Sequence, residues 1–263
     1  RSLNCIETAF NAGARWIVLC DTNGGTLPHE IFNIVSLVSK KIPGKNLGIH
    51  AHNDTENAVA NALAAIEAGV RQVQGTINGL GERCGNTNLI SLIPTLVLKT
   101  NHSSSISKNK LKSLTKISRL LDGLLNIQSD KNAPYVGENA FSHKGGLHAS
   151  AVEKNSKTYE HIEPEIVGNK RSIIISNQSG KSSLSIKLKE LGFNVNKNKL
   201  DYLIMKLKKK EFEGYSYDGA EASFELFVMN ELAKIPEYFK LKSFQVINEF
   251  KDIKDNIRIN NTA

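Results

Sequence analysis

Two histidines separated by a single residue form the part of this sequence whose spacing most clearly indicates chemistry. His50 and His52 lie in the segment LGIHAH at 47–52, which is predicted to form a strand. Side chains two positions apart on a strand point to the same face, so both imidazoles can reach one metal ion. The turn-rich segment 79–86 follows the next predicted strand and brings Asn86, an oxygen donor, to the same end. These residues predict a metal-assisted enzyme.

A His-x-His pair alone is more often a surface or core feature than a metal site, so the remaining donors decide the interpretation. Hard divalent cations prefer oxygen ligands, and a carboxylate is therefore expected beside Asn86. Asp54 is close in the sequence, but it fits better as the N-cap of a helix predicted over 55–68. Asp21 ends its own predicted strand and is the other candidate.

Two further segments allow both a structural and a functional interpretation. The segment DTNGG at 21–25 suits a tight turn because asparagine and glycine accept positive φ angles, but Thr22 and nearby backbone N–H groups can also hold a substrate carboxylate. The loop at 141–148 places His143 and His148 on either side of two glycines, and imidazoles titrate near neutral pH. A catalytic role for His143 stays open beside a structural one.

Composition is that of a globular protein from a reducing compartment. The 263 residues are 40% hydrophobic, and no segment approaches the roughly 20 consecutive apolar residues that span a bilayer. No N-terminal signal pattern is visible. The cysteines Cys5, Cys20 and Cys84 have no zinc-like spacing, which predicts a cytoplasmic location. Cys84 has no evident base beside it, so a nucleophilic role is disfavoured.

The net charge of +8 is concentrated in the second part of the chain. Residues 101–263 carry 26 of the 34 lysines and arginines, and 19 of the 26 acidic residues. A basic excess can indicate nucleic-acid binding. However, the basic run at 206–210 continues an amphipathic helix without an aromatic stacking platform, so a solvated surface is the better interpretation. Neither nucleic acid nor a membrane is expected as a partner.

Helical and strand patterns alternate through the first hundred residues. Thr26 is predicted to N-cap the second helix, with Pro28 in its first turn. The alternation predicts an α/β fold with a parallel sheet, in which ligands bind at the carboxyl ends of the strands. Three such units cannot close an eight-stranded barrel. The predicted strands are 15–20, 47–52 and 70–77, and the predicted helices are 2–12, 26–40, 55–68 and 87–99.

From residue 101 the pattern changes. A polar linker at 101–108 leads to a predicted amphipathic helix at 109–127, and a further helical stretch covers about 180–230. The tail from Phe239 alternates apolar and polar residues, like an edge strand that begins another domain without an evident partner strand.

Four segments carry a resemblance to a known enzyme family. Together they resemble the 2-isopropylmalate synthase, homocitrate synthase and citramalate synthase family, and the DTNGGTLP and SHKGG motifs are most similar to the (R)-citramalate synthase branch. The resemblance covers essentially the whole chain, in order. The segments are LCDTNGGTLPHEI, GIHAHNDTENAVANALAAIEAGVRQVQGTINGLGERCGN, FSHKGGLHASAVEKNSKTYEHIEPEIVGN and YDGAEASFELFV.

The resemblance implies a metal-dependent TIM (β/α)8 barrel, a mostly helical linker region and a regulatory domain. The expected domains are 1–100, a partial barrel of about strands six to eight; 101–238, helical linker subdomains; and 239–263, the truncated beginning of a LeuA-type allosteric domain. The family's first strand, with an Arg-Asp pair, and a glutamate on its fifth strand have no counterpart here. We therefore expect an internal fragment that is inactive by itself.

The same resemblance assigns roles to residues at the strand ends. His50 and His52 are expected to bind a divalent metal cation (Mg²⁺, Mn²⁺ or Zn²⁺), and Asn86 to complete or border that site. Thr22 is expected to contact the 2-oxo acid.

The expected reaction condenses acetyl-CoA with a 2-oxo acid, with pyruvate favoured, to give (R)-citramalate and CoA in isoleucine biosynthesis. His143, often contributed by a partner subunit of a homodimer, is expected to move a proton as a catalytic residue together with Tyr159. The alternative is a 2-isopropylmalate or homocitrate synthase, acting on 2-oxoisovalerate or 2-oxoglutarate. A lyase or aldolase of the same superfamily and a non-catalytic binding protein are less favoured.

Overall fold

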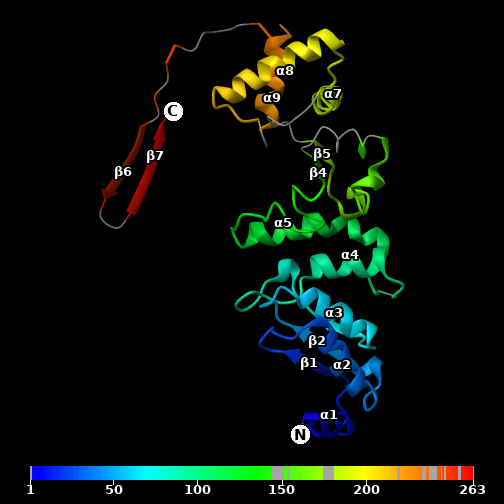
Figure 1. Ribbon diagram of the computed structural model, residues 1–263. Coiled ribbons are helices and arrows are strands. Elements are labelled where there is room, and N and C mark those ends of the chain that lie inside the picture. The colour runs from blue at the N-terminus through cyan, green and yellow to red at the C-terminus, as the bar shows by residue number, and fades with distance from the viewer. Residues whose placement is uncertain are drawn as a thin grey trace. The chain divides into compact units, whose positions relative to one another are not determined.

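Helices and strands alternate through the first hundred residues of the computed structural model, and the strands form one parallel sheet (Figure 1). The order in the sheet is β1-β2-β3, with β1 at Ile17–Asp21, β2 at Leu47–Ala51 and β3 at Gln72–Gln74. The predicted α/β class with a parallel sheet is confirmed. The helices of this region are α1 (Ser2–Asn11), α2 (Pro28–Ser39), α3 (Ala58–Glu67) and α4 (Leu89–Lys99).

The chain divides into two compact units, Arg1–Lys187 and Leu188–Ala263. The predicted loop at 141–148 is described only as far as His143, so His148 lies outside the described residues. No helix of the described ranges combines the length and apolar character needed to cross a membrane. The structure describes residues 2–102, 104–143, 151–152, 154–173, 181–217, 220–232, 235–236, 242–243, 245, 247–253 and 256–262.

Parallel pairing aligns the three strands residue by residue. Cys20 of β1 lies beside His50 of β2, and His50 lies beside Gln74 of β3. Because side chains alternate between the faces of a strand, these three residues share one face of the sheet. Leu47 and Ile49 point to the other face, where they are almost completely buried.

The buried face of the sheet packs against helices. Figure 1 shows α2 and α3 lying beside β1 and β2, and the apolar residues of all four elements form one cluster. A fully buried aliphatic side chain contributes about 1.5–3 kcal/mol, so this cluster holds the sheet to its helices. Its strand and helix members include Ile17, Leu47, Ile49, Ile31, Val35, Val38, Ala62 and Ala65.

The predicted N-caps Thr26 and Asp54 are wrong, because both side chains bind tertiary partners instead. α2 begins at Pro28 with Leu27 at the N-cap, whereas the Thr26 hydroxyl donates to the Asp21 carboxylate at 2.7 Å. The expected place of Pro28 in the first turn is confirmed.

α3 begins at Ala58, three residues later than predicted, with Asn57 at the N-cap. The Asn53 side-chain oxygen accepts a hydrogen bond from the Ala58 amide at 3.1 Å. Asp54, the predicted cap, is bound instead by Arg83.

α5 (Leu114–Leu124) follows a 3-10 helix, η3 (Lys108–Ser113), and turns polar side chains inward. The Thr115 hydroxyl donates to the Val167 carbonyl at 2.8 Å, and the Asn78 amide donates to the Asp122 carboxylate at 2.8 Å. These bonds tie α5 to the segment after β3 and to the 3-10 helix η5 (Pro164–Val167). The predicted helix at 109–127 therefore begins as a tighter turn and ends at Leu124.

Two short strands bring distant parts of the linker region together. β4 (Ser142–His143) pairs in parallel with β5 (Ser172–Ile173), and the Ser172 amide donates to the Phe141 carbonyl at 3.0 Å. This pairing fixes the backbone of His143.

The second unit contains helices and a hairpin. α7 (Lys181–Glu190) spans the boundary between the units, and α8 (Lys197–Phe212) and α9 (Glu221–Glu231) follow it. The predicted absence of a partner strand in the tail is wrong, because β6 (Ile247–Ile253) pairs antiparallel with β7 (Asn256–Thr262).

Replacing Ile49 by alanine is expected to lower the free energy of unfolding by about 2–5 kcal/mol, because the change leaves a cavity in the core. Ile49 is 1% exposed. The loss of unfolding free energy is measured by urea denaturation monitored with circular dichroism. Ile34→Ala is the matched control: Ile34 on α2 is 48% exposed, and its removal is expected to change stability by less than about 0.5 kcal/mol. Equal losses in the two variants would contradict the placement of Ile49 in the core.

Candidate active site at the carboxyl ends of the strands

His50 and His52 lie together at the carboxyl end of β2, as their spacing predicts. Their ring centroids are 5.0 Å apart, and the ring planes make an angle of 68°. Both side chains are half-buried. The alternation of the strand therefore produces the paired imidazoles that a shared metal ion requires.

One nitrogen of each imidazole has a fixed partner. Nδ1 of His52 lies 3.0 Å from the carbonyl oxygen of Asp21, and Nδ1 of His50 lies 3.2 Å from Oε1 of Gln74. Both partners are acceptors, so both Nδ1 atoms carry the hydrogen. Nε2 is then the nitrogen left for a metal on each ring, which is the arrangement typical of metal-binding histidines.

Asn86 joins the pair through its backbone and offers an unused oxygen. Asn86 forms an antiparallel bridge with His52, and its amide donates to the Gly79 carbonyl at 3.0 Å. Among the described residues, the buried Oδ1 of Asn86 has no hydrogen-bond partner. A buried acceptor without a partner is unfavourable, and a bound cation would satisfy it. The donor set of His50, His52 and Asn86 therefore fits a divalent metal.

Arg83 fastens the loops around this site to one another. Its guanidinium donates to both oxygens of Asp54, at 2.7 and 2.9 Å, and to the carbonyl oxygen of Thr22 at 2.8 Å. The hydrogen bond from Arg83 lowers the pKa of the Asp54 carboxyl below its usual value. Three loops, each following a different strand, are thus held by one side chain.

Thr22 lies beside Arg83 in an open recess of about 610 Å³. The other lining residues are Cys20, Asp21, Asn23 and Thr26. The predicted contact between Thr22 and a substrate stays a prediction, and the exposed position of Thr22 is compatible with it.

Asp21 does not supply the carboxylate expected beside the two histidines. It pairs in register with Ala51, on the face opposite His50, and its Oδ1 accepts a hydrogen bond from Thr26. Across the part of the chain that the structure describes, no three His, Cys, Asp or Glu side chains gather as a metal-binding group.

His143 and Tyr159 form a second group. Their ring centroids lie 6.4 Å apart at 68°. Nε2 of His143 is 3.1 Å from the Glu160 carboxylate, which Arg171 also binds. The sequence reasoning missed Glu160 and Arg171. Among the described residues, His143 forms no hydrogen bond and no ring contact with His50 or His52.

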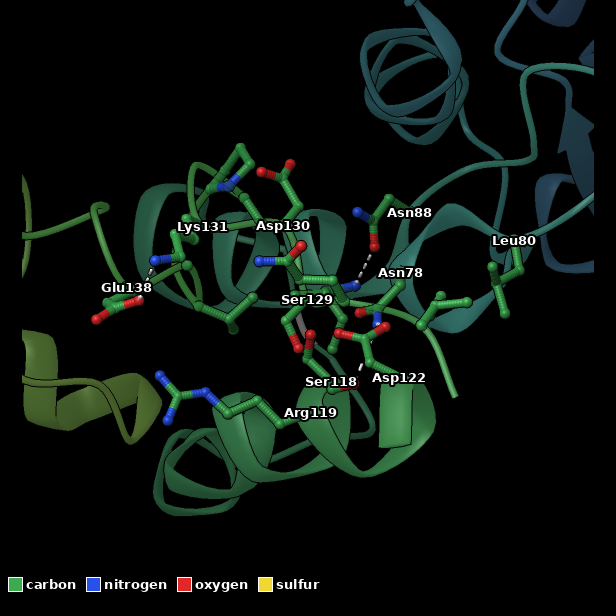
Figure 2. A pocket seen from close by; sticks show the side chains of 17 residues that line it. Asn78, Leu80, Asn88, Ser118, Arg119, Asp122, Ser129, Asp130, Lys131 and Glu138 are labelled. Carbon is green, nitrogen blue, oxygen red and sulfur yellow. Dashed lines mark hydrogen bonds and ion pairs between the residues drawn. The ribbon is translucent and has the colours of Figure 1, made fainter. Parts of the chain in front are cut away.

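A separate hollow of about 570 Å³ lies between α5 and the segment 127–138, and none of the predicted site residues lines it (Figure 2). Two pairs of its polar side chains bind each other. Figure 2 shows the Asn78 amide bonded to Asp122, and Lys131 paired with Glu138 at 3.6 Å.

Comparison with known proteins gives the family. Residues 2–121 match the model of the HMGL-like family, and residues 135–214 match that of the homocitrate synthase post-HMGL domain-like family. The chain belongs to the HMGL-like family and carries the post-HMGL domain after it. The resemblance inferred from the motifs is confirmed.

Three individual relatives show the kinds of synthase to which the chain is similar. The chain is 51% identical to the (R)-citramalate synthase of Aquifex aeolicus, covering 94% of this chain and 47% of that protein. It is 46% identical to the (R)-citramalate synthase of Synechocystis, covering 93% and 46%. It is 35% identical to the 2-isopropylmalate synthase of Cronobacter sakazakii, covering 92% and 47%. The chain spans about half the length of these curated relatives.

Gly85→Ala is expected to disrupt the loop that carries Asn86. Gly85 has a φ of +89°, and an added Cβ would overlap the Gly79 carbonyl oxygen. The left-handed backbone alone costs about 1–2 kcal/mol for a residue with a Cβ, and the overlap adds to that loss. Thermal and urea unfolding measure the change.

Gly123→Ala is the matched control, because an added Cβ at Gly123 of α5 meets nothing within 4 Å. Alanine is favoured over glycine in a helix, so this variant is expected to gain about 0.5–1 kcal/mol. A Gly85→Ala protein as stable as the Gly123→Ala protein would contradict the described loop conformation.

Proposed function

We propose that the protein is an acyltransferase that condenses acetyl-CoA with pyruvate to give (R)-citramalate and CoA. The observation that carries the proposal is a donor set in a chain 51% identical to an (R)-citramalate synthase: His50 and His52 at the end of β2, and Asn86 from the segment after β3. The 35% identity to a 2-isopropylmalate synthase supports the alternative, condensation with 2-oxoisovalerate, less strongly.

In this proposal His50, His52 and Asn86 hold a divalent cation. A cation held there would supply Lewis-acid chemistry, polarising the carbonyl group of the 2-oxo acid and making its carbonyl carbon more electrophilic. Gln74 and the Asp21 carbonyl orient the two imidazoles through their Nδ1 atoms. Thr22, in the open recess beside Arg83, contacts the carboxylate of the oxo acid.

His143 and Tyr159 serve proton transfer. A base accepts a proton from the methyl group of acetyl-CoA, and the methyl carbon bonds to the carbonyl carbon of pyruvate while the carbonyl oxygen takes up a proton to become a hydroxyl group. Water then hydrolyses the thioester to release CoA. An imidazole can accept and return protons near neutral pH. The edge-to-face contact of Tyr159 with His143 supports a joint role for the two residues.

The remaining proposals concern the organisation of the protein. We assign residues 1–100 to strands six to eight of a TIM barrel, 101–238 to helical linker subdomains and 239–263 to the beginning of a regulatory domain. A homodimer in the cytoplasm completes the proposal. The two family matches, in this order along the chain, support the first two assignments.

Substrate selectivity tests the reaction. The full-length protein is expected to release thiol from acetyl-CoA with pyruvate at a kcat/KM about tenfold or more above that with 2-oxoisovalerate or 2-oxoglutarate, because a pocket sized for a methyl group excludes larger substituents. A thiol reagent measures the rate, and mass spectrometry identifies citramalate. Faster turnover of 2-oxoisovalerate would assign the protein to the alternative.

Metal binding tests the site. His50→Ala and His52→Ala are each expected to lower the bound metal content and to reduce turnover by at least about 100-fold, since each variant loses one ligand and exposes the other donors to water. Mass spectrometry of the purified protein measures the metal. His29→Ala is the matched control, because His29 is an exposed histidine on α2. Unchanged metal content in the His50 and His52 variants would contradict the ligand assignment.

A further inference from the structure

Arg83 occupies a backbone conformation that arginine rarely adopts. Its φ is +54°, in the left-handed region, where the backbone crowds the Cβ of an L-residue. Glycine avoids that crowding, and Gly85 adopts a φ of +89° two residues later. Strain at a residue with a side chain persists only where the surrounding structure enforces it, and it gathers at functional sites. The contacts of the Arg83 side chain should then show what the strained backbone supports.

The guanidinium of Arg83 holds the backbone of Thr22 in place. Nη2 donates to the Thr22 carbonyl oxygen at 2.8 Å. Nε and Nη2 donate to the two carboxylate oxygens of Asp54 at 2.7 and 2.9 Å, which makes a bidentate pair. Two parallel hydrogen bonds to one carboxylate fix the plane of a guanidinium. The pairing with Asp54 therefore fixes the direction of the donor that reaches Thr22.

Asp54 also packs against the turn that begins at Thr22. Gly24 of this turn is buried, and a Cβ added to it would overlap Oδ2 of Asp54. The Thr55 hydroxyl donates to the Gly24 carbonyl oxygen at 2.8 Å. The turn is thus held at two of its carbonyl groups, by Arg83 and by Thr55, and Thr22 has little freedom to move.

We propose that Arg83 is a positioning residue, which holds Thr22 where it can bind the carboxylate of the 2-oxo acid. The inference rests on the proposed function, in which Thr22 makes that contact. Thr22 and Arg83 line the same open recess, and Thr22 is exposed, so a substrate in the recess can reach it. A displacement of about 1 Å is enough to weaken such a contact strongly.

The neighbours of Arg83 disfavour a direct contact between its guanidinium and the substrate. Asp54 and the Thr22 carbonyl already use the hydrogens of Nε and Nη2. The remaining nitrogen, Nη1, lies 3.9 Å from the Glu82 carboxylate. An anionic substrate would meet two acidic side chains beside this guanidinium, and like charges repel. Arg83 is therefore expected to act through Thr22.

Kinetics of the full-length protein test the role. Arg83→Asn removes the guanidinium and introduces a residue that tolerates the left-handed backbone. KM for pyruvate is expected to rise about tenfold, the loss typical of one hydrogen bond to a charged group. kcat and KM for acetyl-CoA are expected to change less than about threefold, because a contact made equally in the ground state and the transition state affects KM alone.

Removal of the Thr22 hydroxyl tests whether Arg83 acts through Thr22. In a Thr22→Val background, Arg83→Asn is expected to raise KM for pyruvate less than about twofold further, because the group that Arg83 positions is gone. Wild-type KM in Arg83→Asn, or an equal rise with and without the Thr22 hydroxyl, would overturn the proposal.

Arg119→Gln is the matched control. Arg119 is an exposed arginine of α5 that lines the hollow of Figure 2 and not the recess beside Thr22. This variant also loses one guanidinium, but it is expected to keep kcat and both KM values within about twofold of the wild type, as surface substitutions generally have small effects. A rise in KM for pyruvate equal to that of Arg83→Asn would contradict a specific role for Arg83.

Hydrogen exchange separates this inference from the proposed function. In Arg83→Asn the backbone amides of 22–25 and 54–56 are expected to exchange about tenfold faster than in the wild type, because the two segments lose the side chain that joins them. Mass spectrometry of peptic fragments measures the rates, and unchanged rates would overturn the inference. A wild-type protein that turns over none of the three oxo acids would overturn the proposed function, and the exchange rates would still decide whether Arg83 holds Thr22.

A second variant covers the case in which Arg83→Asn does not fold. Arg83→Lys keeps the charge, so Asp54 retains a cationic partner, but a single ammonium group lacks the fork that binds Asp54 and Thr22 together. It is expected to raise KM for pyruvate at least about threefold and to speed exchange in the same two segments. Wild-type values for both would overturn the proposal.

Discussion

Burial of one face of β2 determines where the chemistry of this protein can occur. Leu47 and Ile49 are packed against α2 and α3, and exposing them would forfeit much of the apolar cluster. Because side chains alternate along a strand, His50 and His52 must then face the other side. Hydrophobic packing of the neighbouring residues therefore orients the imidazoles before any ligand binds.

The loops at the carboxyl ends of the strands complete the candidate site through polar contacts between distant segments. Arg83 joins the segment after β1 to the segment after β2, and backbone bonding of Asn86 sets its amide beside His52. The same logic recurs in the linker region, where β4 and β5 pair and bring Arg171 and Glu160 to His143. In both places parallel strand pairing fixes the backbone. An arginine–carboxylate ion pair, Arg83 with Asp54 or Arg171 with Glu160, then fixes the neighbouring side chains.

Much of this could be predicted from periodicity, and the failures have a common cause. The strands around Ile49 and the pairing of His50 with His52 follow from alternation, which is local. Thr26 and Asp54 were expected to cap helices by local preference, but Asp21 and Arg83 compete for them across the fold. Glu160 and Arg171 gave no signal, because their meeting depends on the β4–β5 pairing. The tail hairpin was missed since β7, NIRINNT, is largely polar.

The alignment of β2 between two neighbours also constrains how this sequence can vary. One residue added within 47–52 would turn every later side chain of the strand to the opposite face, sending the imidazoles toward α2 and α3 and apolar groups toward the open side. The strand behaves like a reading frame, in which a change of length by one alters the meaning of each position that follows. Lineages of this protein are therefore expected to differ in β2 by substitution, and to place their insertions in the connecting loops.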